Sequence, residues 1–276
     1  LKRIKEISLK GFSPSSLETY IKNPKEYYFQ KLLNIKKEDV DESFASHKTI
    51  GLVFHETIEL LYKPFIGKHL EIKALKDSLL KVDKVLKNTF IRNKESFDSG
   101  KNLIIFEVIK SALKTFIQNE LEDIKSGSVV KILALEHQIK STLKLNQEAG
   151  VLVTGIIDRV DEKNGLVRII DYKTGFVNSS NLTIKDMGLI CKDPLRTKAM
   201  QLMCYAWMYY RSNNIKKISA GIISFRNLKN GLMGLKIKDS KSDFIEVRSV
   251  DRFEEELKGL IKEIMDPKID FIDSEI

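Results

Sequence analysis

Two aspartates and a lysine between positions 155 and 175 have the types and spacing of a hydrolytic metal site. Asp158 interrupts an apolar run, Asp171 ends the next one, and Lys173 follows two residues later, on the same face as Asp171 if the run is a strand. Two adjacent carboxylates repel each other unless a cation or a shared proton lies between them. Mg²⁺ is commonly held by one or two carboxylates, and a neighbouring ammonium can orient or help to deprotonate an attacking water. The pattern predicts metal-dependent phosphodiester hydrolysis, and the alternative is an ordinary hairpin with solvated charges.

The two runs are expected to form a hairpin that brings these carboxylates together. Asn-Gly at 164–165 tolerates the positive φ angles of a two-residue type I′ turn. The register that this turn predicts places Asp161 opposite Arg168, a favourable charge pair, and Asp158 opposite Asp171. We expect the pair of aspartates to be a non-hydrogen-bonded pair, with Cα atoms about 4.5 Å apart.

Four short motifs occur in order along the chain. They are Gly-xxx-His (Gly51, His55), Gly-x-x-Asp (Gly155, Asp158), Asp-Tyr-Lys-Thr-Gly (171–175) and Gln-xxx-Tyr (Gln201, Tyr205). With the opening segment 13–33, this set resembles the PD-(D/E)xK nuclease superfamily in its RecB/AddB-like exonuclease branch. The resemblance covers roughly residues 13–271, and four ordered motifs are far more specific than one.

The resemblance implies an α/β fold with a mixed central β-sheet flanked by helices, a restriction-endonuclease-like core, and an N-terminal helical subdomain. We expect one domain over 1–276, mainly helical over 1–127 and with the sheet and catalytic motifs in 128–276. The implied function is that of a metal-dependent DNA exonuclease domain from a bacterial recombination or double-strand-break repair protein. A stand-alone endonuclease and a non-catalytic DNA-binding or scaffold module are the alternatives. A helicase domain or subunit is an expected partner.

Residue by residue, the resemblance implies a Mg²⁺ or Mn²⁺ site. Asp158, Asp171 and the backbone carbonyl of Tyr172 would be ligands, Lys173 would act on the attacking water, and His55 would be a further ligand.

A helix around His55 fits this role. Gly51, His55 and Glu59 share one helix face at i, i+4 spacing, and we expect the small Gly51 to let that helix approach the sheet. The alternative for His55 is a core histidine.

Three further residues are candidates for the same site. Gln201 and Tyr205 are i, i+4 neighbours on an expected helix; in the family such a pair borders the active site and contacts the DNA backbone or the catalytic lysine. The alternative is the edge of a core helix. Glu136 matches an acidic position that the family often carries, although an exposed strand glutamate would look the same.

The cysteines argue against a cofactor that many relatives hold. Those relatives carry an iron–sulfur cluster bound by one cysteine before the proline of the N-terminal segment and three beyond the final helix. Here Asn23 precedes Pro24, and Cys191 and Cys204 are the only cysteines. A cluster takes four thiolates, so we expect none. Packing, or residues beyond Ile276, would then join the first and last segments.

Composition and charge agree with a DNA-binding protein. The net charge of +9 favours a polyanionic partner. Four basic residues between the third and fourth motifs are candidates for phosphate contacts, or belong to a mobile polar loop: Lys185, Lys192, Arg196 and Lys198. No apolar run is long enough to span a membrane, and the chain lacks a signal-peptide core. We expect a cytoplasmic protein, and Leu1 in place of Met suggests a piece of a longer one.

Periodicity gives the expected order of elements. A first helix is capped by Ser15 or Ser16 and a second begins at Pro24. Further helices are expected over 48–62, 71–93, 102–125, 195–211 and 250–265, and strands over 128–141, 151–162, 166–173, 217–225 and 232–247, the last as one strand or a hairpin.

Overall fold

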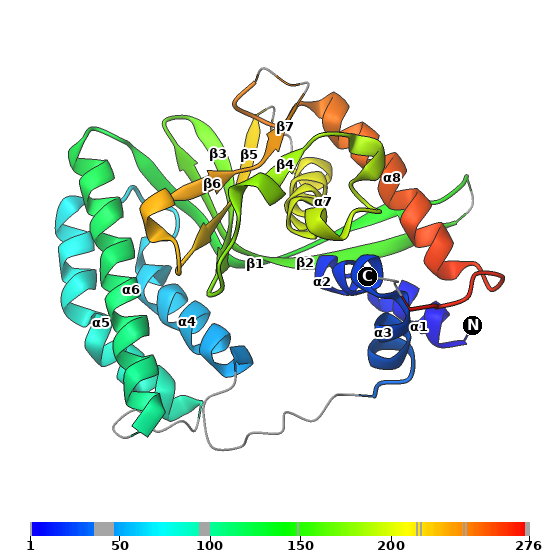
Figure 1. Ribbon diagram of the computed structural model, residues 1–276. Coiled ribbons are helices and arrows are strands. Elements are labelled where there is room, and N and C mark those ends of the chain that lie inside the picture. Colours follow the sequence, from blue (N-terminus) through cyan, green and yellow to red (C-terminus); the bar gives the residue numbers. More distant parts are fainter. Residues whose placement is uncertain are drawn as a thin grey trace.

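A five-stranded mixed sheet forms the centre of the molecule (Figure 1). The computed structural model describes residues 2–35, 47–93, 100–147, 149–213, 215, 217–238, 240 and 242–273. The sheet order is β1 (Val130–Lys144), β2 (Gly150–Lys163), β3 (Leu166–Lys173), β5 (Ile218–Ser224) and β6 (Leu232–Gly234). Within the described residues of this sheet, β3 and β5 are the one parallel pair, and the other neighbouring strands are antiparallel. Strands β3 and β5 are joined through a helix, as a parallel connection requires. The predicted mixed sheet is confirmed.

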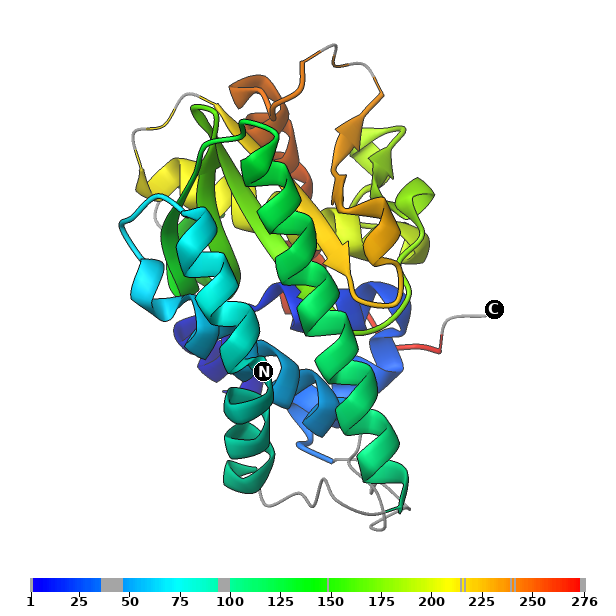
Figure 2. The same ribbon diagram turned by 90° about the vertical axis from the view of Figure 1, so that its left-hand side faces the viewer.

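Helices cover both faces of this sheet and create two hydrophobic cores (Figures 1 and 2). One face carries α4 (His47–Tyr62), α5 (Ile72–Arg92) and α6 (Gly100–Lys125). The other core involves α7 (Thr197–Ser212), α8 (Val247–Met265) and the short α2 (Pro14–Lys22). Besides short 3-10 turns, the structure also has α1 (Lys2–Lys10), α3 (Pro24–Tyr27), which runs into a π-helical turn (Tyr28–Leu32), and a separate small pair of β4 (Thr183–Ile184) with β7 (Lys236–Ile237).

The β2–β3 hairpin has the predicted register near its turn but opens earlier than predicted. Asp161 pairs with Arg168, and Asn164 has a φ of 51°, as a type I′ turn requires. The ladder stops at Arg159 and Ile170. The expected ladder pair of Asp158 with Asp171 is therefore wrong, because the strands separate one residue before it.

The N-terminal segment pairs with the first half of β2, before the residues that pair with β3. Phe12 forms a parallel bridge to Val153; its N–H donates to the carbonyl of Leu152 at 2.8 Å, and its carbonyl accepts from Thr154 at 2.9 Å. On this edge of β2, residues 155–158 lie between Thr154, which bonds to the N-terminal segment, and Arg159, which pairs with β3. The predicted metal-binding aspartate of β2 lies in this interval.

Three local expectations were wrong. The helix predicted to begin at Ser15 or Ser16 is α2, and it is capped by Ser13, because Pro14 supplies the fixed φ of its first turn and Ser16 bonds back to the Ser13 N–H. A Cβ added to Gly51 would meet no atom within 4 Å, so the approach of α4 does not require glycine there. The run 232–247 is neither one strand nor a hairpin, since β6 pairs with β5 whereas β7 pairs with β4.

The first and last segments are joined by packing, as expected. Phe271 stacks on Tyr27 with ring centroids 6.1 Å apart and meets the edge of Tyr20 at 5.9 Å. Asn23 donates from its amide to a carboxylate oxygen of Asp273 at 2.6 Å. The residue before Pro24 thus contributes a hydrogen bond between the first and last segments. Both cysteines of the chain are buried and free.

Candidate active site

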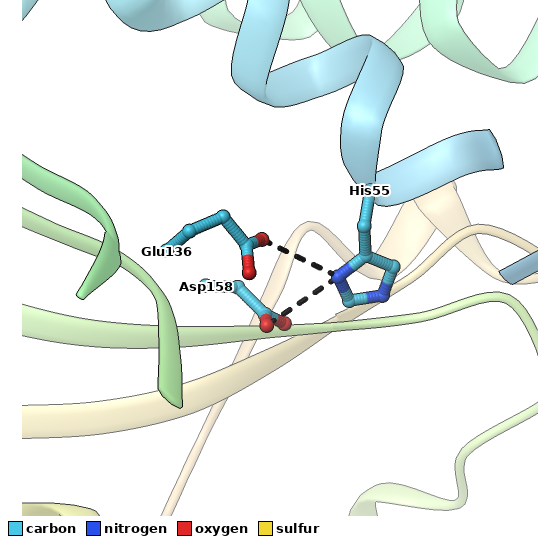
Figure 3. Close-up of side chains that lie close together, drawn as sticks. All are labelled: His55, Glu136 and Asp158. Carbon is cyan, nitrogen blue, oxygen red and sulfur yellow. Dashed lines mark ion pairs between the residues drawn. The ribbon is translucent and has the colours of Figure 1, made fainter. Parts of the chain in front are cut away.

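Three side chains from three different elements converge above the opened hairpin (Figure 3). His55 projects from α4, Glu136 from β1 and Asp158 from β2. The Nδ1 atom of His55 lies 3.4 Å from an Asp158 oxygen and 3.8 Å from a Glu136 oxygen, and one ligand atom from each residue lies within 4.8 Å of the others. All three are partly buried. The cluster has the dimensions of a site for one cation.

Electrostatics also favour a cation here. Burial alone would lower the pKa of His55, but hydrogen bonding to and charge attraction by Asp158 and Glu136 together raise that pKa to about 10. Without metal, the imidazole is therefore protonated at neutral pH and supplies the positive charge between the carboxylates. A metal ion would displace this proton.

Glu136 reaches the cluster from an unusual backbone conformation. Its φ is +43°, in the left-handed region that side chains with a Cβ rarely adopt. The β1–β2 register is the same on either side, with Leu135 opposite Arg159 and His137 opposite Ile157. The conformation is therefore confined to one residue, whose carboxylate lies beside His55. Strain of this kind is often found at functional sites.

Asp171 and Lys173 complete the site from β3. A carboxylate oxygen of Asp158 accepts the backbone N–H of Tyr172 at 2.6 Å, so a side chain takes the place of the next ladder bond. The Lys173 ammonium lies 2.7 Å from an Asp171 oxygen. Burial raises the pKa of Asp171, Lys173 lowers it and Asp158 raises it again, to about 6. Burial opposes the charge of Lys173, yet the adjacent Asp171 holds the pKa of this ammonium above its ordinary value.

The Gln201–Tyr205 pair lies on α7 against β2. The Gln201 amide donates to the Tyr205 hydroxyl at 3.1 Å, and both side chains are buried. Burial, and then the charge of Asp171, raise the pKa of the Tyr205 phenol. A Cβ built on Gly155 would lie 2.8 Å from the Tyr205 ring. The glycine of the Gly-x-x-Asp motif is thus required for the close approach of α7 beside Asp158.

The chain matches the model of the PD-(D/E)XK nuclease superfamily over residues 11–275. It belongs to that superfamily. Two similar proteins are named as a subunit of an ATP-dependent helicase/deoxyribonuclease. The one from Clostridium acetobutylicum is 29% identical over 182 residues, which are 59% of this chain and 15% of that protein. The one from Lactobacillus gasseri is 26% identical over 222 residues, 73% of this chain and 18% of that protein. An uncharacterized protein of Rickettsia conorii is 23% identical over 207 residues, 70% of this chain and 23% of its own length. The chain therefore spans less than a quarter of each of these relatives.

Behind the site of this superfamily member lies a buried charge network that the sequence only partly predicted. Arg159, adjacent to Asp158, is fully buried and contacts Glu120 at 2.7 Å and Asp161 at 2.6 Å. Asp161 also accepts from Arg168 at 2.7 Å, the pair that the register predicted. Arg159 and Asp161 are two residues apart on β2, a spacing that places them on one face. That spacing was the available signal for the missed arginine.

The predicted basic residues do not form a free ring of charge. Lys198 is paired with both carboxylate oxygens of Glu18, at 2.9 and 3.1 Å. Arg196 contacts a backbone carbonyl and an aspartate nearby in the chain. Lys185 and Lys192 are exposed. Two of the four are thus engaged in internal contacts.

Glu59, the third residue of the predicted helix face, lies outside the cluster. Glu59 pairs with Lys63, four residues later and just past the end of α4, at 3.6 Å. Among the described residues, no helix is long and apolar enough to cross a membrane.

Proposed function

We propose that this superfamily member is a divalent-metal-dependent deoxyribonuclease domain that hydrolyses DNA phosphodiester bonds. The observation that carries the proposal is the convergence of His55, Glu136 and Asp158 beside the Asp171–Lys173 pair. In the metal-free protein the protonated His55 and Lys173 offset the repulsion between these carboxylates, and a bound divalent cation would take over the role of the imidazolium.

The donor set fits a Mg²⁺ or Mn²⁺ ion. Carboxylate oxygens suit both ions, and an imidazole nitrogen is better suited to Mn²⁺ than to Mg²⁺. One oxygen of the buried Asp171 lies 2.7 Å from the Lys173 ammonium and has no other hydrogen-bond partner among the described residues. His55, Glu136, Asp158 and Asp171 would hold the ion, with the Tyr172 carbonyl as a further oxygen donor. When bound, the ion would polarise the phosphodiester and activate water.

Lys173 serves this chemistry as a cation. Because its pKa is raised beside Asp171, its Nζ keeps its proton at neutral pH in the metal-free protein. We propose that the ammonium orients the attacking water and stabilises negative charge that develops on the phosphoryl oxygens. This role differs from proton abstraction, for which a lowered pKa would be needed.

Gln201 and Tyr205 act as a positioning pair in this proposal. They are hydrogen-bonded to each other and are held against β2 at Gly155. The phenol keeps its proton because burial disfavours the phenolate. It can therefore donate a hydrogen bond to an anionic group of the substrate strand.

The biological setting is also a proposal. The names of two similar proteins combine a helicase with a deoxyribonuclease. We propose that this chain is the exonuclease part of a comparable recombination or break-repair protein and works beside a helicase domain or subunit. A stand-alone endonuclease with the same site would differ in its products. A non-catalytic DNA-binding module would bind DNA without cleaving it.

End-labelled DNA distinguishes these functions. Linear single- and double-stranded DNA labelled at the 5′ or 3′ end, and a closed circle, would be incubated with Mg²⁺, Mn²⁺ or EDTA. The exonuclease proposal predicts progressive shortening of linear DNA with metal, an intact circle, and no reaction in EDTA. Cutting of the circle would identify an endonuclease, and no cleavage with either metal would contradict the nuclease proposal.

A further inference from the structure

A cavity of about 590 Å³ lies beside the candidate metal site. Its walls come from β1, β2, α7 and the capped first turn of α2, and they include Ser13, Ser15, Gln138, Lys140, Ile156 and Tyr205. Tyr205 is shared with the site already described, since the charges of Asp171 and Asp158 both act on its hydroxyl. The cavity therefore borders the cluster of carboxylates on the α7 side.

The cavity residues on β1 and β2 are cross-strand pairs that lie progressively further from the metal site. Gln138 pairs with Ile156, and Lys140 pairs with Thr154. The register across Glu136 places that residue opposite Asp158, two residues before Gln138. The positive φ of Glu136 interrupts the alternation of faces on β1, because Leu135 packs with the α4–α6 core whereas His137 contacts Tyr209 of α7. The cavity is connected to the site through Tyr205 and through Ile156, which lies two residues before Asp158 on β2. Lys140 is four residues from Glu136, about 13 Å along the strand at about 3.3 Å per residue.

The walls have the chemistry that a nucleotide chain requires. Lys140 is exposed and has no ion-pair partner among the described residues. Gln138 is exposed beside it, and Ser15 offers a hydroxyl. The Ile156 side chain, 47% exposed, adds an apolar surface. The residues that line the cavity include no aspartate or glutamate. A cation with amide and hydroxyl donors next to an apolar side chain suits a phosphate with its sugar and base.

We propose that this cavity is a subsite for the substrate strand on one side of the scissile phosphate, where Lys140 contacts a backbone phosphate and Gln138 donates to the same chain. The inference rests on the proposed nuclease function, because it takes the strand to start at the metal site. A volume of about 590 Å³ is that of a pocket for a small organic ligand. It therefore holds a short stretch of one strand.

Binding measured without catalysis tests the subsite. Lys140→Gln would be compared with Lys144→Gln, which removes the same charge from the next exposed lysine on this face of β1, outside the cavity. Fluorescence anisotropy with a labelled short oligothymidylate in EDTA would report affinity over a range of salt concentrations. We expect Lys140→Gln to weaken binding about tenfold and to lower the salt slope by about 0.7, the loss of one contact to a single strand. Lys144→Gln should change affinity less than about twofold, and Lys140→Arg should restore it.

A substitution at Gln138 tests the subsite without changing any lysine. Gln138→Glu keeps the size of the side chain and places a negative charge on the proposed path, so it should also weaken binding. Equal losses for both lysine variants, or no loss for Lys140→Gln, would overturn the subsite. In either case, cleavage of end-labelled DNA by the unaltered protein would leave the nuclease proposal standing. If the unaltered protein neither bound nor cleaved DNA, both proposals would fail.

Discussion

The left-handed conformation of Glu136 leads to a prediction that separates the effect of a substitution on stability from its effect on metal binding. At most strand positions glycine is less stable than alanine, by roughly 0.5–1 kcal/mol. A residue with a Cβ pays about 1–2 kcal/mol in the left-handed region, and glycine does not. At a φ of +43° the second effect is the larger. We therefore expect Glu136→Gly to be more stable than Glu136→Ala by about 1 kcal/mol.

The two variants should nevertheless share one functional defect. Each removes a carboxylate that lies 3.8 Å from His55 in the cation cluster. Both should bind Mn²⁺ more weakly than the unaltered protein, about tenfold if the ligand contributes about 1.4 kcal/mol. The more stable of the two variants would thus still lack a functional ligand.

Urea unfolding in EDTA would measure the stability difference, and a Mn²⁺ titration of the folded proteins would measure the affinity. Glu162 is a matched control, since it lies on β2 and is not among the residues with a positive φ. There the usual order should hold, with alanine more stable than glycine. If alanine is at least as stable as glycine at position 136, the strain that we assign to Glu136 is absent.

Further predictions concern the remaining site residues. His55→Ala should raise the metal concentration for half-maximal cleavage about tenfold, whereas the exposed His69→Ala should not; early melting with unchanged metal dependence would make His55 a packing residue. Asp171 has a folded pKa of about 6 against an ordinary 3.8, so it binds its proton more tightly when folded and its contribution to stability falls as pH rises from about 4 to 6. Urea unfolding in EDTA should therefore give curves of stability against pH that are not parallel for the unaltered protein and Asp171→Asn; parallel curves would contradict the raised pKa. Asp171→Ala and Lys173→Ala should each abolish cleavage of labelled DNA yet keep DNA binding in EDTA. A variant that loses binding as much as cleavage would favour a binding module. Because Asn23 stands where many relatives have a cysteine, the purified protein should contain no stoichiometric iron, and a brown protein would refute this.

The sequence predicted the local structure of the hairpin but not the point where its strands separate. Asn-Gly at 164–165 set the register, and the pairing of Asp161 with Arg168 followed from it. Separation at Arg159 depends on contacts from distant parts of the chain, where Phe12 pairs with β2 and Tyr205 packs on Gly155. Strand periodicity contains no information on such contacts.

The cation cluster was likewise predictable only in part. The spacing of α4 placed His55 on one helix face, and its meeting with Asp158 follows from the packing of that helix on the sheet. Glu136 appeared as one acidic residue in a strand-like run, and nothing local indicates its positive φ. The strand predicted over 232–247 failed for a related reason. Its segments pair with two different strands, β5 and β4, which only the tertiary fold brings near.

The location of a bound metal ion tests the central claim most directly. Crystals soaked in Mn²⁺ would be measured for anomalous scattering at the manganese edge, with Asp158→Asn crystals treated identically. We predict one strong peak bounded by His55, Glu136, Asp158 and Asp171, which is lost or greatly weakened in the variant. A peak elsewhere in the molecule, or a peak at this site that persists unchanged in Asp158→Asn, would contradict the assignment of these residues to a metal-dependent nuclease site.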